Sequence, residues 1–388
     1  MFNRFPAEKL RASKHSCFLW GPRQTGKSFL LRNVFPNAKF YDLLSANEFR
    51  RLGANPGVFA DECASLPAGK DAPPVVVDEI QKLPELLDEV HKLIASRSGL
   101  RFILTGSSPR KLLRNGGNLL GGRVVRRELF PLSFSEIPDF SLERALNRGL
   151  LPPHYLEDSD VGAVELLNAY VGQYLREEIM AEALVRNVPT FQRFLEIAAI
   201  SNGQTVNFSA IARDCGVSSP TIESYFGILT DTLVGCWVPA WKKRAKRRVI
   251  GQPRFWFFDI GVANELLRRK SVAPGSPEFG ANFEHFVFME LRAFCAYHGR
   301  ENALSWWRTT GGAEVDFILG DNEAAIEVKS TDRPASDHTK GLREHKTEFS
   351  PRRSLLVCRA PRKAKTAEGI EIYPWREFME ELWSGKIW

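Results

Sequence analysis

Eight residues that follow the apolar run 17–20 and lead into an expected helix could bind phosphate. They follow the pattern GxxxxGK[ST] and are Gly21, Pro22, Arg23, Gln24, Thr25, Gly26, Lys27 and Ser28. The glycines let backbone N–H groups wrap around phosphate oxygens, and the helix expected from Ser28 adds the positive end of its dipole. Lys27 is placed to reach the outer phosphates and the Ser28 hydroxyl to bind Mg²⁺. The spacing predicts a site for ATP and Mg²⁺, because a plain glycine-rich turn would not need this strand–loop–helix context.

Two carboxylates, Asp78 and Glu79, come directly after the apolar run 75–77. At the carboxyl edge of a parallel sheet, where α/β folds bind ligands, Asp78 is expected to hold the metal ion. Glu79 is then placed to polarise an attacking water. The pair predicts hydrolysis rather than nucleotide binding alone. The alternative is a strand that ends in two solvated acids.

A third apolar run, 102–104, ends in small hydroxyl residues. Ser107 or Thr105 can lie beside the terminal phosphate and sense its presence. The alternative is a helix cap, a common role of Ser and Thr after a strand. Further along, Arg123 follows two glycines and is the candidate arginine finger.

Near the C-terminus, Asp316 is followed eleven residues later by Glu327 and then Lys329. This pattern resembles the PD-(D/E)xK core of restriction-endonuclease-like folds. Strand alternation puts Glu327 and Lys329 on one face. Asp316 and Glu327 could then share a divalent metal, while Lys329 positions water at a scissile phosphate. Glu284 matches the metal-binding acid of the first helix in that fold, and Glu290 is the alternative. An ordinary charged surface hairpin is the other interpretation.

The middle of the chain has the pattern of a helix-turn-helix, with helices expected over 208–214 and 218–229 around a turn at Gly216. Two strands, near 234–241 and 254–258, are expected to form a wing. Its tip is strongly basic and carries the expected nucleic-acid contacts, which are Lys242, Lys243, Arg244, Lys246, Arg247 and Arg248. A solvated loop, or a helix-turn-helix that serves as a protein-interaction lid, is the alternative.

The candidate residues lie in three regions of the chain that differ in their expected secondary structure. Short apolar strands alternate with helices up to about residue 150, which predicts a doubly wound parallel α/β sheet. A helical and winged-helix region follows, and then a small α/β module with one long helix over 283–297. The predicted domains are therefore 1–150, 151–273 and 274–388.

Composition narrows the class of protein. The 388 residues carry a net charge of +7 and are 44% hydrophobic and 26% charged, which is typical of folded domains. The six cysteines contain no CxxC pair, so neither a disulfide framework nor a zinc cluster is expected. With no apolar leader and no run of about 18 apolar residues, we expect a cytoplasmic protein without membrane association.

The chain resembles a large prokaryotic family of AAA-type ATPases with a C-terminal domain of uncharacterised function. Five motifs carry this resemblance, and they occur in the order GPRQTGKS, VVVDEIQKLPEL, FILTGSS, LLGGR and LFPLSFSEI. The resemblance covers nearly the whole chain and implies a P-loop ATPase core over residues 1–150. It implies that Lys27, Ser28, Asp78 and Glu79 act as argued above. It also makes Arg123 the family's finger, acting in its own subunit or in a neighbour's, which would require a homo-oligomer.

Together these patterns predict an ATPase that acts on nucleic acid, with DNA favoured, and carries a metal-dependent nuclease-like module. The alternative is a regulatory or signalling ATPase whose nuclease-like domain is a non-catalytic binding scaffold. Metal-dependent DNA cleavage that is lost in Asp316→Ala and Glu327→Ala variants discriminates between them.

Overall fold

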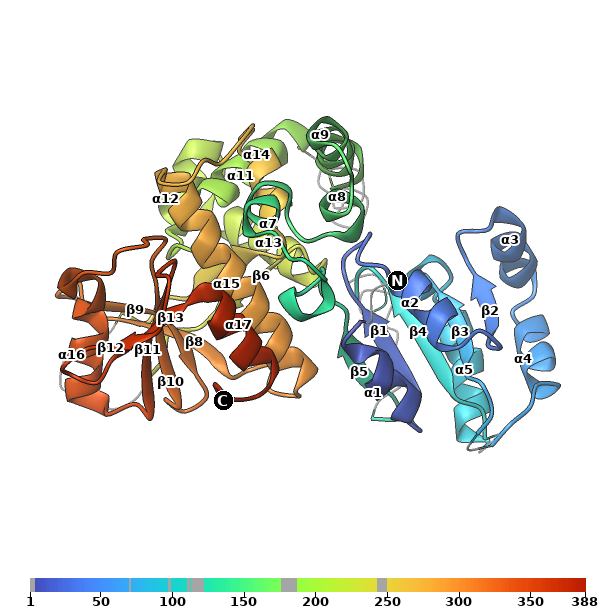
Figure 1. The fold of residues 1–388 in the computed structure, drawn as a ribbon. Coiled ribbons are helices and arrows are strands. Elements are labelled where there is room, and N and C mark those ends of the chain that lie inside the picture. Colours follow the sequence, from blue (N-terminus) through green and yellow to red (C-terminus); the bar gives the residue numbers. More distant parts are fainter. Residues whose placement is uncertain are drawn as a thin grey trace. The chain divides into compact units, whose positions relative to one another are not determined.

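The apolar runs near the N-terminus form a five-stranded parallel sheet in the order β2-β3-β4-β1-β5 (Figure 1). The computed structural model describes residues 4–69, 71–96, 99–109, 112, 122–175, 187–242 and 250–388. The elements up to the end of this sheet are α1 (Pro6–Ala12), β1 (Cys17–Trp20), α2 (Lys27–Val34), β2 (Lys39–Asp42), α3 (Ala46–Ala54), α4 (Gly57–Ala64), β3 (Val75–Asp78), the 3₁₀ turn η1 (Ile80–Lys82), α5 (Leu86–Ala95), β4 (Phe102–Gly106) and β5 (Val125–Glu128).

Helices cover both faces of this sheet. Phe18 and Trp20 of β1 pack with side chains of α3, α4 and α5, whereas Cys17 and Leu19 pack with α1 and α2. Because both faces are covered, every residue of β1, β3 and β4 is buried, so each of these strands is a nearly unbroken apolar run. The predicted doubly wound α/β class is confirmed.

The rest of the chain contains a helical region and a mixed sheet. Its elements are η2 (Phe134–Glu136), α7 (Leu142–Arg148), α8 (Pro152–Tyr155), α9 (Asp160–Ala169), η3 (Tyr170–Leu175), α11 (Val188–Ile200), α12 (Phe208–Cys215), α13 (Ser219–Asp231), β6 (Gly235–Val238), β7 (Arg254–Phe257), α14 (Ile260–Leu266), α15 (Pro277–Tyr297), β8 (Leu304–Arg308), β9 (Glu314–Leu319), β10 (Ala324–Val328), η4 (Ser336–Thr339), α16 (Lys340–Phe349), β11 (Arg353–Cys358), β12 (Ala364–Lys365), β13 (Glu371–Pro374) and α17 (Trp375–Trp383).

The C-terminal sheet has the order β12-β13-β11-β10-β9-β8. Strands β8, β9 and β10 are antiparallel neighbours, and β10, β11 and β13 are parallel to one another. The long helix α15 packs on β8 and β10, and α16 packs on β9, β10 and β11. The predicted long helix is therefore present and begins at Pro277, where Ser276 caps it by accepting a hydrogen bond from the backbone N–H of Phe279.

The chain divides into two compact units. The first comprises Met1–Phe130 and the short segment Asp231–Val234, and the second comprises Pro131–Thr230 and Gly235–Trp388. Apart from Asp231–Val234, the residues of the predicted second and third domains belong to the second unit. The boundary predicted near residue 150 lies inside the second unit, since the longer segment of the first unit ends at Phe130.

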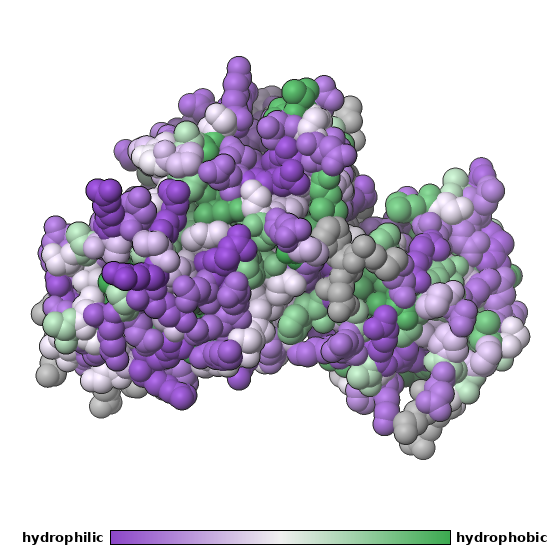
Figure 2. All heavy atoms as spheres, in the orientation of Figure 1, coloured by the Kyte–Doolittle hydropathy of each residue, from purple (hydrophilic) through white to green (hydrophobic). Residues whose placement is uncertain are grey.

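The surface of both units is largely polar on the face that Figure 2 shows, where hydrophilic side chains surround smaller apolar patches. A few large apolar side chains are nevertheless exposed, among them Phe29, Val161 and Ile200. Among the residues that the structure describes, no helix combines the length and the apolar character needed to cross a membrane.

Candidate functional site

The loop between β1 and α2 has the backbone shape that its glycines permit. Gly26 has a φ of 90° and caps α2, which begins at Lys27. A side chain at Gly21 would collide with the carbonyl oxygen of Leu129. Positive φ at one glycine and close backbone approach at the other therefore explain two of the motif's fixed positions. The loop ends at the start of a helix, where backbone N–H groups and the helix dipole favour an anion.

Lys27 lies folded back into this loop. Its Nζ donates hydrogen bonds to the carbonyl oxygens of Gly21 at 2.6 Å and Pro22 at 3.1 Å, and the side chain is buried. Thr25 Oγ1 donates to the same Pro22 carbonyl at 2.8 Å. The lysine is thus held next to the loop by neutral carbonyls, which a phosphate can replace as a stronger, charged partner. Ser28 follows as the second residue of α2.

An arginine that the sequence analysis missed supports the loop from outside. Arg4 is buried, and its guanidinium donates to the carbonyl oxygens of Thr25 at 2.8 Å and Phe130 at 2.7 Å. It therefore joins the phosphate-binding motif to the end of the first unit. No local pattern around Arg4 indicates this role, because both partners lie far away in the sequence.

The predicted acidic pair and the predicted sensor residues meet at the carboxyl ends of β3 and β4. The Thr105 hydroxyl donates to the Asp78 carboxylate and accepts a hydrogen bond from the backbone N–H of Glu79 at 3.1 Å. Gln81 donates from its amide both to the Glu79 carboxylate and to Ser107 Oγ, the latter at 3.0 Å. All five side chains are buried. One hydrogen-bonded network therefore joins both acids to both sensor candidates.

The same edge of the sheet carries the phosphate loop. Strand β4 lies between β3 and β1, and the backbone N–H of Gly21 donates to the carbonyl oxygen of Gly106 at 3.3 Å. Glu79 has a φ of 61°, a left-handed conformation that is uncommon outside glycine and marks a constrained site. The glycine cradle, the buried lysine and the buried carboxylate Asp78 are the donor and acceptor set that Mg·ATP requires, so these residues fit that ligand.

The finger candidate Arg123 is exposed, and its guanidinium contacts the imidazole of His91 on α5. Leu120 and Gly121, which precede Gly122 and Arg123 in the motif LLGGR, lie outside the described residues. The finger role of Arg123 stays a prediction.

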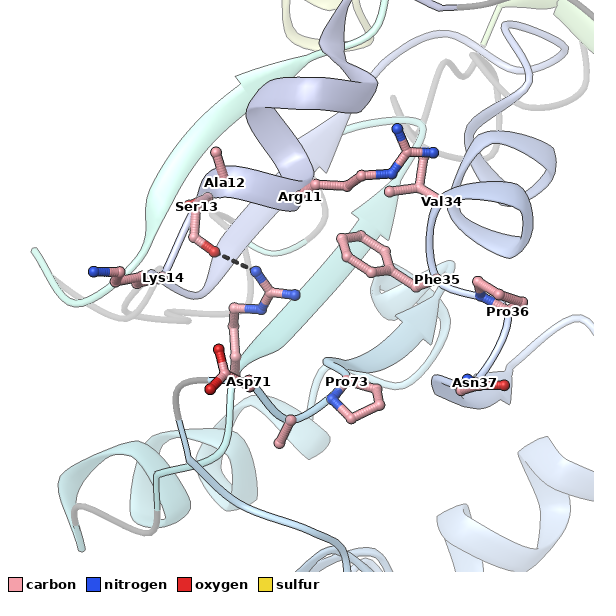
Figure 3. Close-up of a pocket in the computed structure, with 12 residues that line it drawn as sticks. Arg11, Ala12, Ser13, Lys14, Val34, Phe35, Pro36, Asn37, Asp71 and Pro73 are labelled. Atoms are coloured by element: carbon pink, nitrogen blue, oxygen red, sulfur yellow. Dashed lines mark hydrogen bonds between the residues drawn. The ribbon is translucent and has the colours of Figure 1, made fainter.

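A cavity of about 500 Å³ lies at the opposite, amino edge of the parallel sheet (Figure 3). Its lining comes from the segments that precede β1, β2, β3 and β4, and it includes Lys14, Phe35 and Asp71. Arg101, on its wall, donates to the carbonyl oxygen of Ser13 and lies over the Phe35 ring at 5.0 Å. None of the predicted site residues lines this cavity.

In the second unit, neighbouring strands bring the predicted nuclease-like residues together. The last pair in the register of β9 and β10 is Phe317 with Ile326, and Asp316 and Glu327 are the positions next to it on the two strands. Lys329 Nζ lies 2.5 Å from Glu327 Oε1 and 3.8 Å from Asp316 Oδ2. Asp316 also accepts a hydrogen bond from the backbone N–H of Val328 at 2.8 Å.

A second buried cation belongs to this cluster, and the sequence analysis did not predict it. Arg254, the first residue of β7, directs Nη1 toward Glu284 Oε1 at 3.5 Å and Asp316 Oδ1 at 3.8 Å. Its Nη2 pairs with Glu314, and its guanidinium lies 4.1 Å from the centre of the Trp306 ring. We call Glu284, Glu314, Asp316 and Glu327, with Arg254 and Lys329, the carboxylate cluster.

Of the two candidate acids on α15, only Glu284 joins the cluster. Glu290 is buried elsewhere, where it accepts hydrogen bonds from Trp383 Nε1 at 2.6 Å and from the backbone N–H of Phe134 at 2.9 Å. Glu290 therefore ties α15 to α17 and to η2, which is a structural role.

Burial and mutual repulsion raise the pKa values of three acids of the cluster, Glu284, Asp316 and Glu327. Burial, reinforced by the charge of Asp316, raises the pKa of Glu284 to about 8. Burial also raises the pKa of Asp316 and of Glu327. For Lys329 burial acts in the opposite sense, but Asp316 and Glu327 outweigh it and raise the pKa of the ammonium. Both cations therefore remain charged between the acids.

This arrangement does not fit a bound divalent metal ion. Among the residues that the structure describes, no three His, Cys, Asp or Glu side chains are grouped so that they could hold a metal ion. The cluster acids instead face Arg254 and Lys329. We therefore assign no chemical step to a metal here.

The middle region contains the predicted helix-turn-helix, formed by α12 and α13 around Gly216, which has a left-handed φ of 68°. The predicted strand near 234–241 ends earlier, at Val238. Beyond it the chain leaves the hairpin and runs along β8, where the backbone N–H of Trp241 donates to the carbonyl oxygen of Trp306 at 2.7 Å. Likewise Ile250 donates to Arg308 at 2.9 Å.

The described residues on either side of the basic segment, Trp241 and Ile250, therefore both hydrogen-bond to the backbone of β8. Lys242 is exposed. The other five expected contacts lie outside the described residues, and they are Lys243, Arg244, Lys246, Arg247 and Arg248.

Three protein families match successive parts of the chain. Residues 13–138 match a family described as "AAA domain", residues 139–273 match a domain of unknown function (DUF8612), and residues 279–378 match another (DUF4143). The chain is 27% identical over 343 residues to an uncharacterised protein of Mycobacterium tuberculosis, covering 86% of this chain and 75% of the relative. An uncharacterised protein of Methanocaldococcus jannaschii is 24% identical over 340 residues, covering 80% and 73%.

Two solved structures are similar at low identity. The Walker-type ATPase PABY2304 of Pyrococcus abyssi is 17% identical, with a TM-score of 0.43, over 69% of this chain and 96% of that protein. The AMPPCP-bound DnaA of Aquifex aeolicus is 13% identical, with a TM-score of 0.29, over 58% and 84%. By its family match, its parallel sheet and its phosphate loop, the N-terminal part of the chain is an AAA-type, ATPase-like domain.

Proposed function

We propose that the first unit binds Mg·ATP and hydrolyses it. The observation that carries this proposal is the buried network of Asp78, Thr105, Glu79, Gln81 and Ser107 beside the phosphate loop. Hydrolysis needs a carboxylate held at a defined position next to the terminal phosphate, and this network holds two.

Each residue has a defined part in the proposed reaction. The loop's backbone N–H groups bind the phosphates, and Lys27 exchanges its carbonyl partners for phosphate oxygens. Ser28 and Asp78 would hold Mg²⁺, which would supply positive charge against the phosphates when bound. Glu79 orients the attacking water and accepts its proton at the carboxylate. Ser107 or Thr105 reports whether the terminal phosphate is present, because Thr105 is hydrogen-bonded to Asp78 and Ser107 is linked through Gln81 to Glu79.

Steady-state ATP hydrolysis and ATP binding test this proposal separately. We expect Glu79→Gln to keep ATP affinity and to lose roughly 10²- to 10⁴-fold in turnover. Lys27→Ala should weaken ATP binding roughly 10- to 100-fold. The matched control is Glu85→Gln, which removes an exposed carboxylate six residues further along the chain. Turnover that is equal in wild type and in Lys27→Ala would contradict the proposal.

We further propose that the partner of this ATPase is nucleic acid, with DNA favoured. The supporting features are the helix-turn-helix of the structure and the basic composition of the segment 242–248 in the sequence. Binding should be salt-dependent, because phosphate contacts release counterions. Replacing Lys242 and Lys243 by Ala should lower the slope of log affinity against log salt by about 2. The control variant removes the same charge at two other exposed positions, Lys340 and Arg362. If the control lowers the salt-dependence slope as much as the Lys242 and Lys243 replacement does, the proposal is contradicted.

For the C-terminal module, the ion pairs of Arg254 with Glu284 and Asp316 favour a binding scaffold over a metal-dependent nuclease. A nuclease of this type needs acids that are free to take up a divalent ion. We therefore expect no difference between wild type and Glu327→Ala when linear and circular DNA are incubated with Mg²⁺ or Mn²⁺, with or without ATP. Cleavage that disappears in Glu327→Ala would establish the nuclease instead.

A further inference from the structure

The carboxylate cluster contains a cation that comes from outside its own sheet. Glu314, Asp316 and Glu327 belong to the adjacent strands β9 and β10, whereas Arg254 begins β7, which pairs with β6 in a separate two-stranded sheet. The Arg254 side chain is only 4% exposed. Its burial beneath Trp306 and against three acids identifies it as part of the cluster's interior.

The four carboxylates of the cluster are compensated in part by its two cations. The four acids face two buried or half-buried cations, Arg254 and Lys329, and Arg308 adds a more exposed one at 3.4 Å from Glu314. Buried carboxylates without a cation are strongly destabilising. In a metal-dependent site the compensating charge is a divalent ion, and here it is the guanidinium between Glu284 and Asp316.

A guanidinium in this position competes directly with a metal ion. Mg²⁺ and Mn²⁺ require several oxygen ligands, at 2.0–2.1 Å in the case of Mg²⁺. Nη1 of Arg254 lies within 4 Å of an oxygen of Glu284 and of Asp316, so a divalent ion bound by both acids would meet a positive charge at van der Waals distance. One Glu327 oxygen, Oε2, is buried without a hydrogen-bond partner among the described residues. The cluster therefore retains acceptor capacity that the two cations do not use.

We propose that the Arg254 guanidinium takes the place of the divalent ion in this cluster, so that the acids fasten the β6–β7 hairpin to the C-terminal sheet, and that removing Arg254 turns the cluster into a divalent-cation site. This inference rests on the scaffold form of the proposed function. It is independent of ATP hydrolysis, since Arg254 and the phosphate loop belong to different units.

The test is Mn²⁺ binding to the full-length chain without nucleotide, measured by titration calorimetry and by the paramagnetic resonance signal of free Mn²⁺. We expect no Mn²⁺ bound at this cluster in wild type and about one Mn²⁺ per chain in Arg254→Met. The additional change Asp316→Asn should abolish the new binding. The matched control is Arg308→Met, which removes the other arginine that pairs with Glu314 and should bind like wild type.

Two results would overturn the inference. The first is Mn²⁺ binding to the wild-type chain that is lost in Asp316→Asn, which would mean that Arg254 does not exclude the ion. The second is a folded Arg254→Met variant that binds no Mn²⁺. If Arg254→Met does not fold, judged by circular dichroism, Arg254→Gln replaces it, because its amide can still donate to the acids. The measurement contains no ATP, so failure of the ATPase proposal leaves its outcome unaffected.

Discussion

Gln81 shows how a neutral side chain can organise an acidic site. Its amide donates to both the Glu79 carboxylate and Ser107 Oγ, which lie on different strand ends. Both of these partners lie at the ends of β3 and β4, so we assign Gln81 the role of positioning Glu79. A carboxylate without this partner can turn away from the attacking water, and small misplacements reduce rates strongly.

We therefore expect Gln81→Leu to lower the turnover of ATP about tenfold or more while leaving ATP affinity close to that of wild type. A purely structural role would change affinity and thermal stability as well. Turnover, ATP binding and melting temperature measured side by side distinguish the two. Gln81→Glu should not rescue turnover, because its carboxylate would face that of Glu79. Equal losses of affinity and turnover would refute the positioning role.

His345 is a buried histidine surrounded by aromatic rings. Its ring centre lies 4.9 Å from that of Trp307, 5.0 Å from Phe349 and 5.5 Å from Trp241. Neither ring nitrogen has a hydrogen-bond partner among the described residues, and burial lowers the pKa to about 4. The pKa of this histidine in the folded state therefore lies below its value near 6.5 in the unfolded state. Between pH 4 and pH 6.5 the unfolded state consequently binds more protons than the folded state.

Stability of the second unit should therefore be intact above pH 6.5 and should fall as the pH drops from 6.5 toward 4. His345 alone accounts for about 3 kcal/mol at the end of this range. His154 and His285 have pKa values lowered in the same direction by burial, so they add to the loss. Replacing His345 by Phe should reduce the difference between urea unfolding free energies at pH 7 and pH 5. An unchanged difference would show that His345 does not titrate with unfolding.

At the scale of elements, the start of α1 is tied to the phosphate loop by Arg4. The guanidinium spans the carbonyl oxygens of Thr25 and Phe130 while remaining buried. Arg4→Ala removes two charge-assisted hydrogen bonds, and each is worth roughly 1.5–3 kcal/mol. We expect the variant to melt earlier and to bind ATP more weakly, as measured by calorimetry. Arg11→Ala, an exposed arginine on α1 itself, is the control and should change neither quantity.

Elements defined by unbroken apolar runs could be predicted, and contacts between distant elements could not. Strands β1, β3 and β4 lie where the sequence predicts them, because a sheet covered on both faces requires apolar residues at every position. Asp316 and Glu327 could be paired in advance, since the two strands are antiparallel neighbours. Arg254 could not, because it reaches Glu314 from a different sheet, 60 residues away. The turn of the chain onto β8 after Val238 was missed for the same reason.

At the scale of the whole molecule, one short segment belongs to a different unit from the elements on either side of it. Asp231–Val234 is part of the first unit, although most of α13 precedes it and β6 follows it in the second. Leu233 is buried in the hydrophobic core that also contains Phe102 and Leu104 of β4. The Ser108 hydroxyl, next to the sensor candidate Ser107, donates to the carbonyl oxygen of Asp231 at 3.3 Å. The end of the helix-turn-helix is thus continuous with a segment that is anchored beside β4.

Leu233 has a φ of 61°, which is strained for a residue with a β-carbon, so its burial must outweigh that strain. The substitution Leu233→Ala keeps the strained backbone conformation but removes the side chain's apolar contacts. We therefore expect it to lower the free energy of unfolding of the first unit by about 2–5 kcal/mol. Scanning calorimetry measures this effect, and the transition that ATP shifts upward identifies the first unit, because a ligand stabilises the unit that binds it. The control, Ile200→Ala, removes an apolar side chain that is 68% exposed and should shift no transition by more than about 0.5 kcal/mol. If Leu233→Ala lowers only the transition that ATP leaves unchanged, the segment is not anchored in the nucleotide-binding unit. If it lowers the ATP-sensitive transition, the helix-turn-helix is tethered to the core that responds to ATP.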